Sequence, residues 1–167
     1  MEQWEHVFAY LFHTKLLIAA GLGALIGLER ELSGKDPSLR TFALISLGSC
    51  VFGLVSIHSV EGIEHGDPSR IAAQVVTGIG FLGAGAIFRS SMGVSGLTTA
   101  ALMWVTAALG LAVAYNHVEV AVSATVVALF CTVGLGTVHR LIRLVRPEEP
   151  SYGTKSTSNG DKTSSIE

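Results

Sequence analysis

Five long apolar segments, separated by short connections that carry nearly all the charge, fill residues 16–138 of the chain. The third segment, residues 71–88, has no ionised group and is bracketed by Arg70 and Arg89. Its eighteen residues would span roughly 27 Å as a helix, which is close to the hydrocarbon thickness of a bilayer. The pattern therefore predicts that lipid, not water, surrounds most of this protein.

The predicted fold is an all-α integral membrane protein, a compact bundle of about five transmembrane helices. We expect a transmembrane domain over residues 1–146, with spans at about residues 14–28, 41–57, 71–88, 97–115 and 118–138. Residues 147–167 are polar and low in complexity, and they cannot bury enough surface to fold. We expect them to form a disordered cytoplasmic tail.

The spans suggest a worn internal repeat of two helical hairpins. The first span is glycine-rich and ends at Arg30, and the second opens with the sequence LRTFAL at residues 39–44. The third span is also glycine-rich and ends at Arg89, and the fourth opens with LTTAAL at residues 97–102. Two hairpins with the same orientation are typical of parallel repeats in transport-type folds.

Composition supports a membrane protein. Of the 167 residues 49% are hydrophobic and only 14% are charged, whereas a soluble domain is about one quarter charged. Most of the 19 glycines lie inside the apolar segments, where small residues let helix backbones approach closely. The glycines expected to pack helices together are Gly23, Gly27, Gly78, Gly80, Gly83 and Gly85. Cys50 and Cys131 both lie inside apolar segments and are expected to be small core residues.

The positions of lysine and arginine predict the orientation. With five spans, nine of these residues lie on one side of the membrane and only Lys15 and Arg70 lie on the other. The first set is Arg30, Lys35, Arg40, Arg89, Arg140, Arg143, Arg146, Lys155 and Lys162. Because positive residues concentrate on the cytoplasmic side, we expect the N-terminus outside and the C-terminus in the cytoplasm.

Polar residues at four segment ends form a candidate cluster on the cytoplasmic side. They are Glu29, Arg30, Glu31, Arg40, Thr41, Arg89, Thr98 and Thr99. Buried together, their carboxylates and guanidiniums could pair and lock the hairpins, or bind a cation or an anion. Alternatively, they are interfacial anchors that follow the positive-inside rule. Both interpretations stay open.

Gln74 and Thr77 form a candidate intramembrane polar pair, one helical turn apart in the third span. Such a pair serves either as a hydrogen bond between helices or as part of a pathway. No Asp, Glu, Lys or Arg lies at the centre of any span, which disfavours a proton-coupled or ion-pumping mechanism. The acidic loop at residues 61–68 could sense Mg²⁺ or Ca²⁺ weakly, but an ordinary solvated loop explains it as well.

The sequence contains no catalytic constellation. Residues 78–83 match the dinucleotide pattern G-x-G-x-x-G, but they lie in the middle of an apolar span instead of between a strand and a helix. Nucleophile-elbow, zinc-protease and Walker A patterns are absent. We therefore expect no enzyme, no catalytic residue, no metal ligand, no cofactor and no nucleic-acid partner.

Five stretches of the chain resemble the bacterial MgtC/SapB family. They are residues 27–31 (GLERE), 39–44 (LRTFAL), 70–89 (RIAAQVVTGIGFLGAGAIFR), 96–101 (GLTTAA) and 104–110 (WVTAALG). The resemblance implies a bacterial inner-membrane protein of about five helices, linked to adaptation under low Mg²⁺. It also implies a role in modulating other membrane machinery, including the ATP synthase.

Departures from the family pattern favour its SapB-like branch. Thr98 and Val105 stand where some virulence-type members have Asn and Cys, and Ser95 stands where a basic residue is usual. Many members also carry an ACT-like C-terminal domain, whereas a short polar tail follows residue 146 here.

Two functions remain open. The first is a non-enzymatic regulator of membrane machinery, linked to Mg²⁺ homeostasis or stress adaptation. The second is a small oligomeric transporter or channel, with Mg²⁺ as the candidate ion. Expected partners are membrane lipid, another membrane protein, or a second copy of the chain in a dimer.

Overall fold

A computed structural model describes residues 2–91 and 93–145 of the chain, with the side chains of residues 13–91, 93–136 and 138. This part contains α1 (Glu2–Leu32), α2 (Leu39–His58), α3 (Arg70–Gly85), α4 (Leu97–Ala114) and α5 (Val118–Val145). A small antiparallel hairpin, β1 (Phe88–Ser90) and β2 (Gly93–Ser95), connects α3 to α4. The tail expected at residues 147–167 lies outside the described residues.

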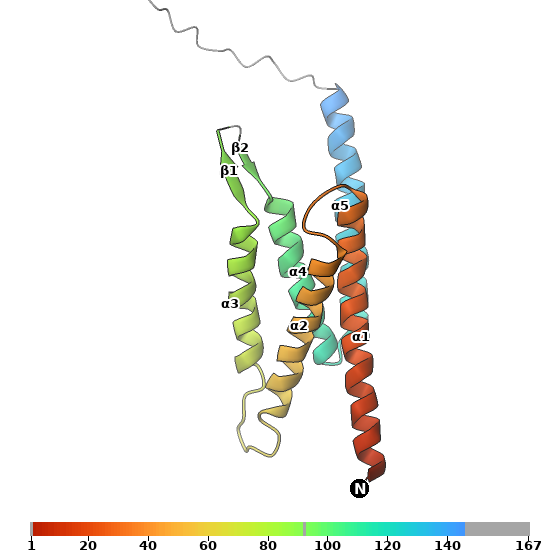
Figure 1. Ribbon diagram of the computed structural model, residues 1–167, viewed down its shortest axis with the longest axis vertical. Helices are drawn as coiled ribbons and strands as arrows, with labels where there is room; N and C mark the ends of the chain where they lie inside the picture. The colour runs from red at the N-terminus through yellow and green to blue at the C-terminus, as the bar shows by residue number, and fades with distance from the viewer. Residues whose placement is uncertain (1, 92, 146–167) are drawn as a thin grey trace, which may run out of the picture.

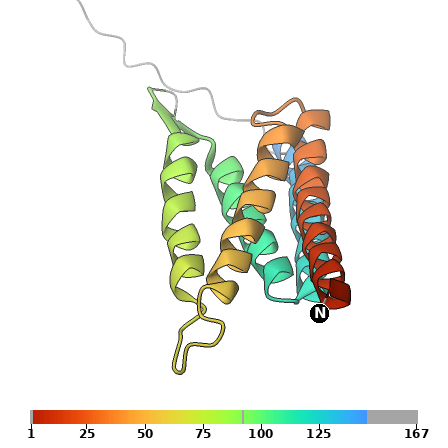
Figure 2. The same cartoon turned by 60° about the horizontal axis from the view of Figure 1, so that its bottom comes forward.

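The helices run up and down in one bundle (Figure 1). Helix α2 packs between α1 and α4, and α5 packs against α4 and α1. Helix α3 lies at the edge of the bundle, beside α4 and α2, as both views show (Figures 1 and 2). The mostly helical architecture predicted from the apolar segments is therefore confirmed.

Glycines bring α2 close to its two neighbours. A Cβ on Gly23 of α1 would lie 2.5 Å from the carbonyl oxygen of Phe42, and one on Gly27 would lie 2.5 Å from Cα of Leu39. On the other side of α2, a Cβ on Gly110 of α4 would collide with the carbonyl oxygen of Ser46. Gly23 and Gly27 thus lie where α1 approaches α2 closely, and Gly110 adds a close contact that was not predicted.

Two buried threonine hydroxyls are satisfied within their own helices. Thr106 donates to the carbonyl oxygen of Leu102 at 2.7 Å, and Thr125 donates to that of Ala121 at 2.8 Å. Both threonines are buried. These bonds let α4 and α5 carry the two threonines in an apolar environment, whereas the buried hydroxyl of Ser46 in α2 has no partner among the described residues.

Three helices are long and apolar enough to cross a membrane by length and composition. They are α2, α4 and the part of α5 from Val118 to Gly136. Helix α3 has 16 residues and so is about 24 Å long, slightly shorter than one hydrocarbon thickness. The crossing of the membrane by α1 and α3 stays a prediction.

The third helix ends earlier than predicted, and the all-α expectation is wrong between the third and fourth helices. Helix α3 stops at Gly85, and Phe88 and Arg89 belong to β1. Gly93, the first residue of β2, and Gly96, just before α4, adopt positive φ angles of 130° and 87°, which glycine tolerates better than other residues. A Cβ on Gly96 would also collide with the carbonyl oxygen of Ala86.

The two helical hairpins, α1–α2 and α3–α4, run in the same direction (Figure 1). In the first hairpin Gly23 contacts α2 closely, and in the second a Cβ on Gly83 would lie 3.7 Å from the Cβ of Ala100. The first hairpin is thus packed more tightly than the second. An internal repeat stays a prediction.

Candidate functional site

The polar cluster gathers at one end of the bundle. Helices α1 and α3 end there, and α2 and α4 begin there (Figure 1). Charged and hydroxyl-bearing residues at these four ends therefore share one face of the molecule, as the order of the segments predicted.

Arg30 is the buried centre of this cluster. Its side chain is only 3% exposed, and its Nη2 donates a hydrogen bond of 3.2 Å to Oγ1 of Thr99, which is 6% exposed. The Nε of Arg30 is buried and has no hydrogen-bond partner. The bond links the end of α1 to the first turn of α4, and part of the donor capacity of the guanidinium is unused.

The carboxylates of the cluster bond to nearby groups and not to the arginines. Oε2 of Glu31 accepts from the backbone N–H of Leu39 at 3.3 Å, at the first residue of α2. Oε1 of Glu29 accepts from the hydroxyl of Ser33 at 3.0 Å, while Oε2 of Glu29 is buried without a partner. Among the described residues these carboxylates form no ion pair with an arginine, so the expected pairing is not what locks the hairpins.

The remaining predicted residues are not drawn into the buried centre. Arg40 and Arg89 are exposed, and Arg89 lies on β1 opposite Val94. Thr98 is exposed, and Thr41 is half-buried. The predicted residues therefore divide into two groups. Arg30 and Thr99 are buried and join α1 to α4, whereas Arg40 and Arg89 are exposed, as expected for interfacial anchors.

A large cleft opens beside Arg30 between α1, α4 and α5, with a volume of about 1190 Å³. Its polar end is lined by Glu29, Arg30, Ser33, Lys35 and Thr98. Its walls are mostly apolar and come from α4 and α5, for example Val105, Val127 and Ala128. We refer to it as the Arg30 cleft.

A second, smaller groove of about 580 Å³ lies between α2 and α3. Gln74 lines this groove with Thr41, Ser49 and Gly78. Gln74 and Thr77 are both exposed, and neither makes a hydrogen bond within the described part of the chain. The expected bond between helices is therefore not made inside this molecule.

The glycines of α3 differ in their surroundings. Only Gly83 is close to another helix, whereas Gly78, Gly80 and Gly85 have nothing within 4 Å of an added Cβ. Gly78 lines the open groove between α2 and α3, and a Cβ on Gly80 or Gly85 would point into open space. Among the described residues these three glycines make no close contact with another helix, so their expected packing role stays a prediction.

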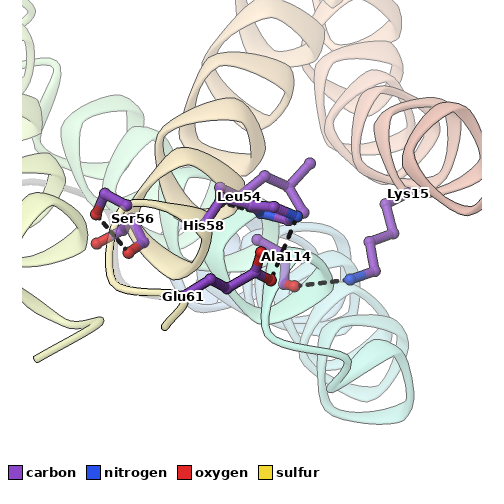
Figure 3. A network of polar contacts seen from close by, with 7 residues as sticks. Lys15, Leu54, Ser56, His58, Glu61 and Ala114 are labelled. Atoms are coloured by element: carbon purple, nitrogen blue, oxygen red, sulfur yellow. Dashed lines mark hydrogen bonds and ion pairs between the residues drawn. The ribbon is translucent and has the colours of Figure 1, made fainter. Parts of the chain in front are cut away.

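Two polar links at the opposite end of the bundle were not predicted (Figure 3). The Nζ of Lys15 in α1 donates to the carbonyl oxygen of Ala114 at 3.0 Å, where α4 ends. A cation at the C-terminus of a helix is favourable because it compensates unpaired carbonyls. The hydroxyl of Ser56 in α2 donates to the carbonyl oxygen of Pro68 and accepts from the N–H of Ala72 at 3.3 Å. These two bonds tie the start of α3 to α2.

The acidic loop between α2 and α3 does not assemble a metal site. Among the described residues no group of three or more His, Cys, Asp and Glu side chains could hold a metal ion. Asp67 instead accepts hydrogen bonds from the hydroxyl of Ser69 at 2.7 Å and from its N–H at 2.9 Å. These bonds lower the pKa of the Asp67 carboxyl below its ordinary value.

Comparison with known proteins gives consistent matches. The model of the MgtC family matches residues 16–141. An uncharacterized protein of Haemophilus influenzae is 44% identical over 126 residues, covering 71% of this chain and 53% of that protein. The Escherichia coli K12 protein named "Putative magnesium transporter YhiD" is 45% identical over 123 residues, covering 71% of this chain and 57% of the relative.

A third relative covers nearly the whole chain. Protein MgtC of Salmonella typhimurium is 38% identical over 169 residues, which are 99% of this chain and 71% of that protein. The chain spans only about half the length of the Haemophilus and Escherichia relatives. No solved structure matches the chain.

Proposed function

Because the chain belongs to the MgtC family, we propose that it regulates other machinery of the bacterial inner membrane without catalysing a reaction. Its three apolar helices make it a multi-pass membrane protein. The magnesium-related name of the Escherichia coli relative supports a link to Mg²⁺ homeostasis, and stress adaptation is part of the same proposal. The excess of Lys and Arg at one end supports a cytoplasmic C-terminus and an N-terminus outside.

The uncovered surface of α3 carries this proposal. Of its residues only Ala72, Ile79 and Gly83 are buried, and Phe81 is 83% exposed. Gly80 has open space where a Cβ would lie. Glycine on a lipid-facing surface contributes little to a helix unless another backbone packs closely on it. This surface therefore suits contact with a transmembrane helix of a second protein.

Small side chains follow one line along the same surface. Ala73, Thr77, Gly80 and Ala84 recur at steps of four, three and four, and all four are exposed. Residues at these steps lie on one side of a helix. We infer that the partner is another membrane protein, with a second copy of this chain as the alternative. Nucleic acid and soluble cofactors have no part in the proposal.

Site-specific photocrosslinking in native membranes tests the proposal. A photoreactive residue at Phe81 should capture a different membrane protein, whereas one at Val126, 61% exposed on α5, should capture much less of it. Crosslinks from position 81 to other copies of this chain alone would contradict the proposed regulatory role and favour a homo-oligomer.

A matched pair of glycine substitutions separates docking from folding. Gly80→Leu and Gly21→Leu both introduce bulk where no neighbour lies within 4 Å, so the membrane abundance of both variants should stay normal. Only Gly80→Leu should lose the captured protein. Equal capture by the two variants would exclude this surface of α3 as the docking site.

The second candidate is a small oligomeric transporter or channel for Mg²⁺. It is favoured by the name of the Escherichia coli relative and by the position of Gln74, which lines the α2–α3 groove with Thr41 and Ser49. Purified chain in liposomes, loaded with a Mg²⁺-sensitive dye, tests it directly. A flux that is lost in Gln74→Leu would support transport over regulation, and no flux would exclude transport by the chain alone.

A further inference from the structure

The Arg30 cleft has the form of a site for an amphiphile. Charged and hydroxyl-bearing side chains lie at one end, where α1 ends and α4 begins. Apolar side chains continue from there along α4 and α5. The lining residues of α5 run from Ala124 to Gly136, twelve positions, or about 18 Å along the helix.

Two buried polar atoms at this end lack partners. The Nε of Arg30 is a donor without an acceptor, and Oε2 of Glu29 is an acceptor without a donor. Both atoms are closed off from water, so bulk water does not satisfy them. A buried group left in this way costs free energy, and most such groups in proteins have a partner. Both residues line the cleft, so the two unpaired atoms belong to side chains at its polar end.

The charges select the chemistry of that ligand. The charged lining residues are Arg30, Lys35 and Glu29, so positive charge exceeds negative charge at the polar end. A guanidinium recognises phosphate particularly well, because its planar N–H groups match the phosphate oxygens. The unpaired oxygen of Glu29 requires a donor beside that phosphate. An ethanolamine headgroup supplies both a phosphate and an N–H donor, whereas a choline headgroup has no N–H.

The geometry points to the Arg30 cleft as a binding site for one molecule of phosphatidylethanolamine. The phosphate accepts from Arg30 and Lys35, the ammonium donates to Glu29, and an acyl chain lies along Val105 and Val127. The site needs the bundle to lie in a membrane, but it does not depend on the regulatory role proposed above.

Native mass spectrometry of the purified full chain, after exchange into defined lipid, tests this site. We expect one phosphatidylethanolamine to be retained per chain, and at least tenfold less phosphatidylcholine. Arg30→Gln should lose the retained lipid. Glu29→Gln should retain lipid but lose the preference for ethanolamine over choline. Equal retention of both lipids by the unsubstituted chain would overturn the assignment.

A blocking variant covers the case in which Arg30→Gln does not fold. Ala101 is exposed and lines the cleft, so Ala101→Trp should fill it and displace the lipid. Ala108→Trp places the same bulk at an exposed position of the same helix that is not among the lining residues. This control should retain the lipid. Full retention in Ala101→Trp would refute the site.

A further experiment with inorganic phosphate distinguishes a bound lipid from a bound free anion. Inorganic phosphate at millimolar concentration should neither displace the lipid nor raise the melting temperature of delipidated chain. Stabilisation by inorganic phosphate that disappears in Lys35→Ala, but not in Arg40→Ala, would assign the polar end to a free anion and overturn the lipid site.

Discussion

The Nη2 of Arg30, near the end of α1, bonds over 3.2 Å to Oγ1 of Thr99 in the first turn of α4. The two residues are 69 positions apart, and both are buried. A guanidinium in such a place is stable only while an acceptor compensates its lost hydration. The bond therefore fixes the end of α1 against the start of α4.

Replacing Thr99 tests whether the buried guanidinium of Arg30 depends on this acceptor for stability. Thr99→Val removes the acceptor and leaves the guanidinium of Arg30 without its partner, so the free energy of unfolding should fall by about 1–3 kcal/mol. Thr99→Ser keeps a hydroxyl and should recover most of the loss. Reversible unfolding in mixed detergent micelles measures both variants. Thr98→Val, at the neighbouring exposed position, is the control and should change stability little.

Close glycine packing around α2 gives a second prediction. Gly110→Ala places a Cβ against the carbonyl oxygen of Ser46, and overpacking of this kind lowers stability by about 1–3 kcal/mol. Gly48→Ala in α2 adds the same methyl where nothing lies within 4 Å, so its stability should be unchanged or slightly higher. The melting temperatures of the two purified variants, measured by thermal unfolding, test this prediction. Equal melting temperatures would show that α2 and α4 can separate without cost.

The loop before α3 gives a prediction about pH. Hydrogen bonds from Ser69 hold the pKa of the Asp67 carboxyl below its ordinary value. The stabilisation from this carboxylate is therefore present above the unfolded pKa of about 3.9, and it is lost as the pH falls through the lower folded pKa. Ser69→Ala removes the hydroxyl donor, so NMR titration should find the pKa of Asp67 closer to its ordinary value. Ser59→Ala, whose hydroxyl bonds to Ser56, should leave this pKa unchanged.

The orientation can be tested by cysteine labelling. In a background with Cys50 and Cys131 replaced by alanine, Arg89→Cys should react with an impermeant maleimide only after the cells are opened. Ile63→Cys, at a position 60% exposed in the loop between α2 and α3, should react in intact cells. Labelling of residue 89 from outside intact cells would reverse the proposed topology.

The sequence by itself determined the helical architecture and the gathering of the polar ends. Apolar segments of this length form helices because lipid offers no partner for backbone N–H and C=O groups. Antiparallel connections then bring the ends of α1 and α3 to the same face as the starts of α2 and α4. The packing of Gly23 and Gly27 on α2 also followed from their spacing, since residues four apart share a helix face.

Only the tertiary structure decided which residues meet. Spacing could not choose Thr99 over Thr98 as the partner of Arg30, because that choice depends on how α4 is rotated about its axis. It also could not tell that Gly110 packs on α2 while Gly80 remains uncovered, since glycine is small wherever it lies. The strands after α3 are a further case, because the apolar run to residue 88 predicted helix, whereas Phe88–Ser90 pairs with Gly93–Ser95.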